Sequence, residues 1–156
     1  MTDFAIDSSR TAARVDTRWR TSTHGEDAAR PGTLDLSKFI SGTHYNIGGR
    51  ADNVIPSGVA VQYNDSTKMY EPWVPGTPAV GEPGDEDYEA PTGEPIAGFI
   101  NDDQGIDVYR RQGVAASTKS SFALLVHGII ETAFLPIAAQ AAAVKDAQST
   151  GSFVFV

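Results

Sequence analysis

The chain has no cysteine, no long apolar run and no excess of basic residues, and each absence excludes a class of protein. Without cysteine, its 156 residues can form neither disulfides nor thiolate metal sites. The apolar runs are far shorter than the roughly 20 residues that a membrane-spanning helix needs. The formal net charge of −8 disfavours a nucleic-acid partner, because phosphate binding needs a basic surface. We therefore expect a globular protein that binds neither nucleic acid nor membrane.

The sequence also lacks the motifs that accompany catalysis. It has no Gly-x-Ser-x-Gly nucleophile motif, no phosphate-binding Gly-Lys-Ser/Thr loop and no Gly-x-Gly-x-x-Gly dinucleotide motif. The histidines His24, His44 and His127 lack metal-ligand spacing, and His127 stands in an apolar stretch typical of a core or interface. The N-terminus lacks the basic and apolar regions of a signal peptide, so we expect no export by that route. These absences predict a protein without enzyme activity, metal or cofactor.

Charge is unevenly distributed along the chain. Residues 1–30 contain five acids and five arginines, so the remainder carries the whole net charge of −8. Residues 74–94 contain six acids, four prolines and four glycines without a single basic residue. Because proline and glycine interrupt regular structure and like charges repel, this segment is predicted to be an exposed acidic loop.

Three acidic residues at alternate positions in that loop are spaced like the first ligands of a calcium-binding loop. Asp85, Asp87 and Glu89 supply suitable oxygen ligands. However, Ala90 and Ile96 stand where such a loop requires glycine and glutamate. We therefore predict a solvated loop and no metal site.

Residues 1–45 are dominated by small and polar side chains, which predicts an extended N-terminal arm without a core of its own. Within the arm, Val15, Thr17 and Trp19 alternate with charged residues, and this period of two is typical of a strand. A strand with one apolar and one charged face, lying outside the core, needs another sheet, so we predict strand addition to a partner. The alternatives are a strand packed on this protein's own body and a disordered tail. The predicted partner-binding residues are Ala13, Arg14, Val15, Asp16, Thr17, Arg18, Trp19 and Arg20.

Residues 46–156 are predicted to form a β-rich body. Val59–Tyr63 and Lys68–Trp73 flank the turn residues Asn64-Asp65-Ser66, which indicates a hairpin. Alternation and apolar content predict further strands at 94–100, 106–110, 122–126 and 129–135, with a bend at His127–Gly128.

The C-terminal third has the densest apolar content and is expected to organise the core. Pro136 can begin a helix, because its missing N–H costs nothing at the first helical position. Ile137, Ala141 and Val144 then recur on one helical face, which leaves Gln140 off that face, and a strand over Ser152–Val156 ends the chain. The predicted fold class is mainly β with one short α-helix (α+β). A body of this size has a limited core, and oligomerisation is a common remedy, so we predict body or subunit contacts at Trp73, Pro136, Ile137, Phe153 and Phe155.

The order of these features resembles the lambda-type phage head decoration protein family. The resemblance is carried by the hairpin Val59–Trp73, with Ser66-Thr67-Lys68 at its turn exit and a late tryptophan, and by Pro95-Ile96-Ala97-Gly98-Phe99-Ile100. It continues through the strands of 122–135, the Leu135-Pro136 step, the short helix and the apolar C-terminal strand. It covers residues 56–156, and the acidic loop of 74–94 is longer than in the family pattern.

The resemblance implies a compact β-tulip or barrel-like body with an extended arm. Family members form trimers on the outer surface of the mature capsid, at or near three-fold positions, and cement neighbouring major capsid protein subunits through strand addition by the arm. It therefore implies a structural virion protein made in the host cytoplasm, with the major capsid protein and two further copies of itself as partners. Two alternatives stay open. One is a carbohydrate-binding or fibre-type β module that uses Trp19, Tyr70 and Trp73, and the other is an enzyme that uses the carboxylates of 82–89.

Overall fold

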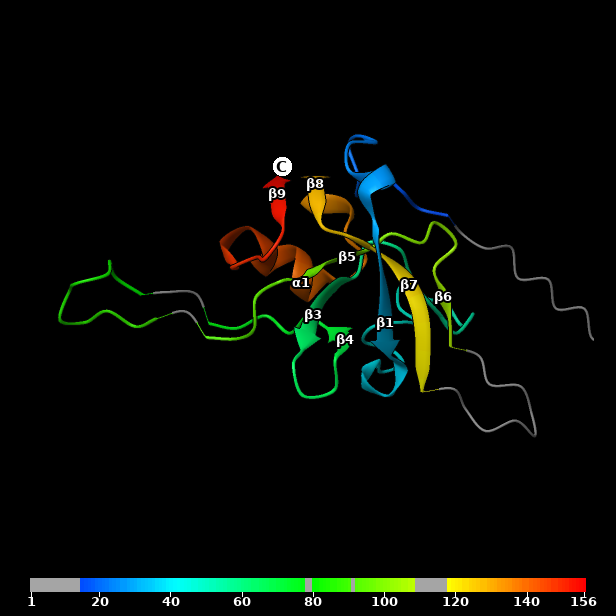
Figure 1. Ribbon diagram of the computed structural model, residues 1–156, viewed down its shortest axis with the longest axis horizontal. Coiled ribbons are helices and arrows are strands. Elements are labelled where there is room, and N and C mark those ends of the chain that lie inside the picture. Colours follow the sequence, from blue (N-terminus) through cyan, green and yellow to red (C-terminus); the bar gives the residue numbers. More distant parts are fainter. Residues whose placement is uncertain (1–14, 78–79, 91, 109–117) are drawn as a thin grey trace, which may run out of the picture.

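Five strands close into a small barrel in the computed structural model, which describes residues 15–77, 80–90, 92–108 and 118–156 (Figure 1). The strand order is β1-β4-β3-β5-β7, and the pairs are antiparallel except for β1 with β4. The predicted mainly-β class with a barrel-like body and one short helix is thus confirmed. The barrel strands are β1 (Arg30–Asp35), β3 (Ala60–Asn64), β4 (Met69–Pro72), β5 (Gly98–Ile100) and β7 (Lys119–Leu125).

Two small sheets and several short helices surround the barrel. β2 (Val54–Ile55) pairs antiparallel with β6 (Ile106–Asp107), and β8 (His127–Ile130) pairs parallel with β9 (Ser152–Phe155). The one α-helix of the described residues, α1 (Ala138–Ala143), continues into the 3-10 turn η4 (Val144–Asp146). The other 3-10 turns are η1 (Glu26–Ala28), η2 (Leu36–Lys38) and η3 (Thr132–Phe134).

The β3–β4 hairpin forms where it is predicted, and its turn shows why. The Asn64 side-chain oxygen accepts hydrogen bonds from the backbone N–H groups of Ser66 and Thr67, at 3.0 and 3.2 Å. Lys68 adopts the left-handed conformation (φ 58°), and its N–H donates to the Asn64 carbonyl at 2.8 Å. This local chemistry sets the register, which pairs Tyr63 with Tyr70.

Strand β1 overturns the predicted boundary between an arm of residues 1–45 and a body of residues 46–156. Its six residues pair with β7 from Arg30↔Leu124 to Asp35↔Lys119, and Leu34 is fully buried inside the barrel. The sequence Arg-Pro-Gly-Thr-Leu-Asp does not alternate, and its proline and glycine are residues typical of a turn. The body therefore includes residues well before 46.

Three predicted strands are shorter than expected. β5 begins only at Gly98, while Ile96 forms an isolated bridge with Ser149. β6 covers Ile106–Asp107, and residues 109–110 lie outside the described residues. The strand predicted over 129–135 ends at Ile130 and is followed by η3.

The core consists of two adjoining clusters, one on each side of the barrel wall. The first fills the barrel around Leu34, Val61 and Ile100 and continues toward β2 and β6. The second lies between the barrel, the β8–β9 sheet and α1, and it is built around Trp19 and Phe99. The predicted helical face is confirmed at Ile137 and Val144, which are buried, and Ala141 packs against the second cluster.

Candidate functional site

Trp19 anchors the leading segment, which we define as residues 15–29, to the second core cluster. Its side chain is completely buried, its indole N–H donates to Ser57 Oγ at 3.3 Å, and its ring stacks on Phe99 with centroids 5.9 Å apart. A Cβ at Gly58 would lie 2.9 Å from the indole, so a side chain there would displace the ring. Trp19 is therefore part of the core, and the prediction that it covers apolar surface on a partner is wrong.

Arg20 is the second anchor of the leading segment, with only 8% of its side chain exposed. Its Nη1 pairs with Glu26 Oε1 at 2.9 Å and donates to Asn101 Oδ1, while its Nη2 pairs with Asp103 Oδ1 at 2.7 Å. Its guanidinium carbon also lies 5.2 Å from the Trp19 ring centroid. These partners offset the cost of burying the charge. The prediction that Arg20 meets a partner protein is therefore wrong.

Residues 17–20 form a turn, and the strand-like pairing of residues 15–20 is limited to an isolated antiparallel bridge between Arg20 and Ile130. The Arg20 N–H donates to the Thr17 carbonyl at 3.0 Å, and this turn directs the indole of Trp19 inward. Two further bonds join the segment to β8 and its end, from Thr21 N–H to the Ile129 carbonyl (3.3 Å) and from Glu131 N–H to the Trp19 carbonyl (2.8 Å). The alternation thus does not produce a free strand here, because the tryptophan is buried in this protein's own body.

Exposed side chains remain just before the anchor. Val15 is 55% exposed, and Asp16 and Arg18 are exposed, while Thr17 is half-buried. Arg18 Nη2 pairs with Asp16 Oδ2 at 2.6 Å, and this hydrogen bond lowers the pKa of the Asp16 carboxyl and raises the pKa of Arg18. The Arg18 guanidinium also lies over the ring of Phe134, 4.5 Å from its centroid. The predicted residues Ala13 and Arg14 lie outside the described residues.

The five residues predicted to form body or subunit contacts all pack against this chain's own body. Trp73 and Ile137 are buried, Pro136 is half-buried, and the half-buried rings of Phe153 and Phe155 lie 5.1 and 6.4 Å from the Phe99 ring. Because Trp19 and Trp73 are both buried, the aromatic sugar-binding platform that they were to form with Tyr70 does not exist. Val154 and Val156, which alternate with the two phenylalanines on β9 and beyond, are the exposed apolar residues of this strand region.

Gln140 is a buried polar residue that the helical spacing placed away from the core. Its Oε1 accepts from the Ala60 N–H at 2.9 Å, and its Nε2 donates to the carbonyls of Ala60 and Trp73, at 3.0 and 2.8 Å. The side chain thereby joins α1 to β3 and to the residue that follows β4. The position of Gln140, three residues after Ile137 on the same helical face, is a signal in the sequence that could have indicated this contact.

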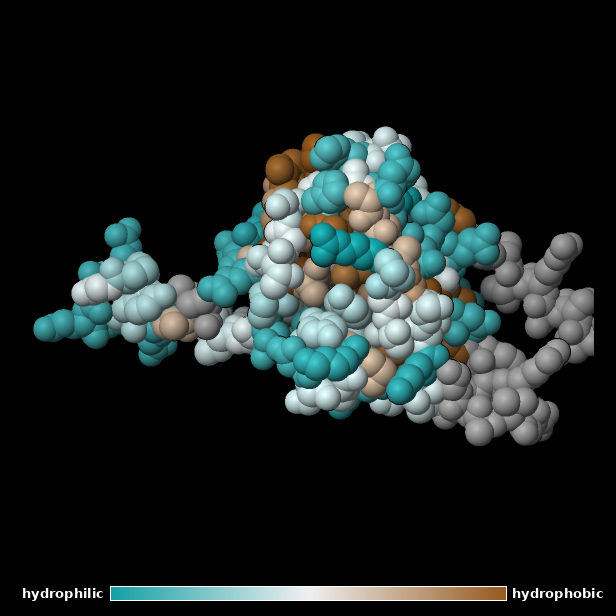
Figure 2. All heavy atoms as spheres, viewed as in Figure 1, coloured by the Kyte–Doolittle hydropathy of each residue, from teal (hydrophilic) through white to brown (hydrophobic). Residues whose placement is uncertain are grey.

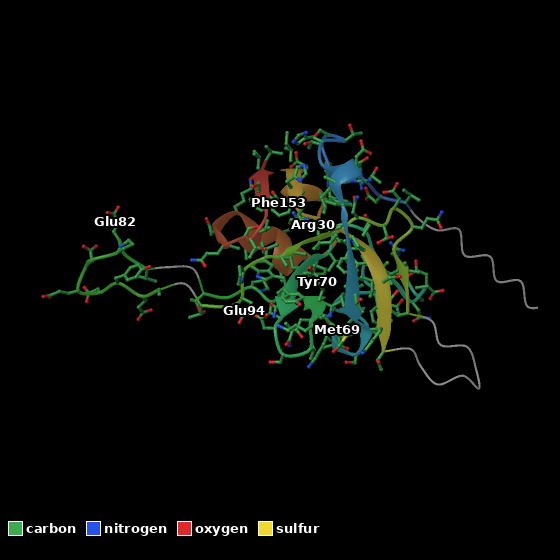
Figure 3. All side chains as sticks on the ribbon, in the orientation of Figure 1. Arg30, Met69, Tyr70, Glu82, Glu94 and Phe153 are labelled. Carbon is green, nitrogen blue, oxygen red and sulfur yellow. The ribbon has the colours of Figure 1, made fainter. Side chains whose placement is uncertain are left out.

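The acidic loop forms a narrow projecting ribbon, which we call the acidic ribbon (residues 77–92 apart from 78–79 and 91). Figures 1 and 3 show it extending away from the barrel, with Glu82 near its far end. Val80 and Glu89 exchange two backbone hydrogen bonds of 3.0 Å, and Thr77 and Thr92 join its base through backbone and hydroxyl groups. The predicted exposure is confirmed. Its acids are Glu82, Asp85, Glu86, Asp87 and Glu89.

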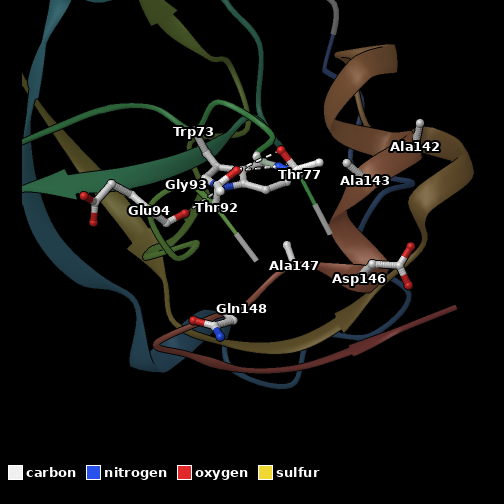
Figure 4. A pocket seen from close by; sticks show the side chains of 11 residues that line it. Trp73, Thr77, Thr92, Gly93, Glu94, Ala142, Ala143, Asp146, Ala147 and Gln148 are labelled. Carbon is white, nitrogen blue, oxygen red and sulfur yellow. Dashed lines mark hydrogen bonds between the residues drawn. The ribbon is translucent and has the colours of Figure 1, made fainter. Parts of the chain in front are cut away.

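A small pocket of about 200 Å³ lies at the base of the ribbon (Figure 4). Trp73, Thr77 and Thr92 line one side of it, and Ala143 and Asp146 of the α1–η4 region line the other. The Trp73 indole N–H already donates to the Glu94 carbonyl at 2.9 Å. The pocket is below the size of a typical small-molecule site.

A larger groove, which we call the basic groove, lies between the barrel and the β8–β9 sheet and has a volume of about 990 Å³. Among the described residues that line it, Arg30 at the start of β1 is the one permanently charged residue, and none is acidic. His24 and His127 face each other there with ring centroids 5.2 Å apart. Aromatic, hydroxyl and apolar side chains complete the lining, notably Tyr63, Tyr70, Thr150, Ser152 and Val154.

Tyr70 shows how crowded one wall of the basic groove is. Its ring lies 5.0 Å from that of Tyr63 and 5.4 Å from that of Phe122. Burial raises the pKa of its phenol, the neighbouring Tyr63 adds to the rise, and the positive charge of Arg30 opposes it. The hydroxyl therefore stays protonated at neutral pH and can donate a hydrogen bond.

The described residues contain no group of three or more histidine, aspartate or glutamate side chains able to hold a metal ion. In the same part of the chain, no helix has the length and apolar character to cross a membrane. No family model matches the chain, and comparisons with curated proteins and with solved structures likewise return no significant match. The function is therefore argued from the residues and their geometry.

Proposed function

We propose that this protein decorates and stabilises the outer surface of a phage capsid. It binds as a trimer at three-fold or quasi-three-fold positions and cements major capsid protein subunits through its N-terminal residues. Its role is structural, and it uses no cofactor. The order of hairpin, glycine-containing strand, Pro-started helix and apolar C-terminal strand supports this function, since these are the features that resemble the decoration family.

The observation that carries the proposal is the double anchor at Trp19 and Arg20. A segment that cements one protein to another must transmit force to its own core, and a fully buried tryptophan provides such an attachment. Arg20 pairs with Glu26 of η1 within the same segment, and its contacts with Asn101 and Asp103 tie this point to the turn after β5. The chain before this anchor is thus attached firmly to the body at one end.

The burial of Trp19 and Arg20 also changes which residues are proposed to contact the capsid. Because Trp19 and Arg20 belong to the body, the contact is assigned to residues 1–18 in place of 13–20. Within this contact, Val15 covers apolar surface on the shell and Arg18 meets acidic or carbonyl groups, since both side chains are exposed. Strand addition to the capsid protein remains the proposed mode of binding.

Co-sedimentation with undecorated shells, assembled from the major capsid protein of the same phage, tests this function. The full-length chain is expected to bind to saturation in multiples of three copies per three-fold position. A variant that begins at residue 15 should retain the melting temperature of the full-length protein and lose shell binding. Equal binding by both proteins would overturn the arm mechanism, and no binding by the full-length chain would overturn the function itself.

A further inference from the structure

The basic groove is unusual on this protein because it contains no acid. After residue 30, the chain has 15 acids and 7 basic residues, from the totals of 20 and 12 less the five of each in residues 1–30. The groove nevertheless carries Arg30, which is exposed, beside His24 and His127. An acidic molecule with one acid-free, arginine-bearing groove favours an anionic occupant there.

The remaining lining suits a peptide occupant. Tyr63 and Tyr70 contribute aromatic rings, Ser152 contributes a hydroxyl group, and Val154 is an exposed apolar residue of the lining. Tyrosine and arginine are enriched in protein interfaces, where they combine apolar contact with hydrogen bonding. The volume of about 990 Å³ lies at the upper end of the range for small-molecule pockets, so it accommodates several residues of a chain.

The acidic ribbon has the complementary properties. Its described residues carry five acids and no basic residue, and it also presents Val80, which is 52% exposed. The backbone pairing of Val80 with Glu89 and of Thr77 with Thr92 gives the ribbon a defined shape before any contact, which lowers the entropy cost of docking.

We propose that the acidic ribbon of one copy docks into the basic groove of a second copy. The ribbon leaves its own body beside Trp73 and α1 and extends away from it (Figure 1), so its tip is available to another molecule. Figure 2 shows the contrast between the hydrophilic ribbon and the apolar surface at the β8–β9 end of the body.

The contact is head-to-tail, because each copy offers one ribbon and one groove. Such contacts close into a ring when the rotation between copies allows it, and three of them would make the proposed trimer. This inference rests on the proposed self-association and is independent of capsid binding. The isolated protein therefore tests it, and failure of shell binding leaves it untouched.

Cysteine cross-linking tests the contact directly, because the native chain has no cysteine. Val154→Cys, on the rim of the groove, is mixed with Glu86→Cys, on the ribbon, under mild oxidation. We expect a disulfide-linked pair that contains one copy of each variant, detected by non-reducing electrophoresis and mass spectrometry. The matched control pairs Glu86→Cys with Thr43→Cys, which lies beyond η2 at the opposite end of β1 from Arg30. Equal yields with both partners would overturn the proposal.

Sedimentation equilibrium supplies the thermodynamic test. Arg30→Glu should weaken self-association about ten-fold or more, since close interfacial charge pairs couple strongly. A ribbon carrying Asp85→Lys and Asp87→Lys should be equally defective alone and should associate with the Arg30→Glu protein when the two are mixed. Urea unfolding checks that each variant is folded. Association that survives Arg30→Glu unchanged, or a monomeric wild-type protein whose groove instead binds a glycan or phosphate, would overturn the proposal.

Discussion

The leading segment is attached to the barrel by buried side chains, whereas the acidic ribbon is held in shape by contacts between its own two arms. In the leading segment, Trp19 lies in the core and Arg20 is clamped by two acids. In the ribbon, the Thr77–Thr92 bonds and the close approach of Gly76 to Gly93 join the two arms to each other at their base. Both segments carry many charges, but only the first is fixed to the core by its side chains.

This difference separates the two proposed roles. A segment fixed to the core by a tryptophan can transmit load, because moving it means removing the indole from a packed cluster. A ribbon paired with itself keeps its shape without contributing to the core, so it can present charge to another molecule. We therefore expect changes in the leading segment to alter stability, and changes in the ribbon to alter association.

The largest effect is expected from Trp19→Ala. Truncating a buried aromatic side chain typically costs ~3–5 kcal/mol, through lost burial and the cavity that remains. The free energy of unfolding, measured by urea denaturation, should fall by this amount. In the matched control, an Asn-Gly turn replaces residues 78–91, and its unfolding free energy should stay close to that of the wild type. Similar losses in both proteins would contradict the difference in attachment.

A smaller loss is expected from Arg20→Ala. Removing the guanidinium leaves Glu26, Asn101 and Asp103 without their partner, and because the two acids are partly exposed we expect a loss of ~1–3 kcal/mol. Arg18→Ala is the matched control, because Arg18 and its partner Asp16 are exposed, and it should change stability by less than ~0.5 kcal/mol. Thermal and urea unfolding of the two variants would show whether the burial of the arginine, and not its charge alone, determines the loss of stability.

Gln140→Ala tests how strongly the Gln140 side chain holds α1 against β3 and Trp73. It removes the hydrogen bonds to both backbone groups of Ala60 and to the Trp73 carbonyl. The Ala60 carbonyl still accepts from the Trp73 N–H, but the loss of the side-chain partner from the Ala60 N–H and the Trp73 carbonyl should cost ~1–3 kcal/mol. Gln140→Glu should also be destabilising, since a carboxylate cannot donate to the two carbonyls. Urea unfolding measures both losses. An alanine variant as stable as the wild type would show that the helix is held by its apolar face alone.

The smallest expected effect concerns the pKa of Asp16. The hydrogen bond from Arg18 lowers this pKa in the folded protein, so the pair contributes stability above the ordinary aspartate pKa. That contribution is lost as the pH falls through the lowered folded value. Carboxyl-carbon NMR titration should show the Asp16 pKa rising toward its ordinary value in Arg18→Ala. An unchanged pKa in this variant would show that Arg18 is not the cause.

The sequence correctly predicted the elements that are determined by interactions between residues close together in the chain. The β3–β4 hairpin follows from the turn chemistry of Asn64, and the helix after Pro136 follows from apolar spacing. β1 was missed because its partner β7 lies far along the chain and its own residues do not alternate.

The anchor was missed for a related reason. The alternation that surrounds Trp19 is present in the sequence, but its burial depends on Ser57, Gly58 and Phe99. The size of a tryptophan side chain was the available signal, since such an apolar surface is seldom left exposed without a partner. Gln140 was misplaced because its polar side chain was assigned to the outer face, although a residue three positions after Ile137 lies on the same helical face as Ile137 and Val144.

Shell binding by two truncated proteins tests the central claim most directly. One variant begins at residue 15 and retains the anchor, and the other keeps residues 1–77 and 92–156 with the Asn-Gly turn in place of the ribbon. Both are mixed with undecorated shells and sedimented beside the wild-type protein. The account predicts that the ribbon-less protein still binds the shell and that the protein lacking residues 1–14 does not. Shell binding that needs the ribbon and not residues 1–14 would contradict it.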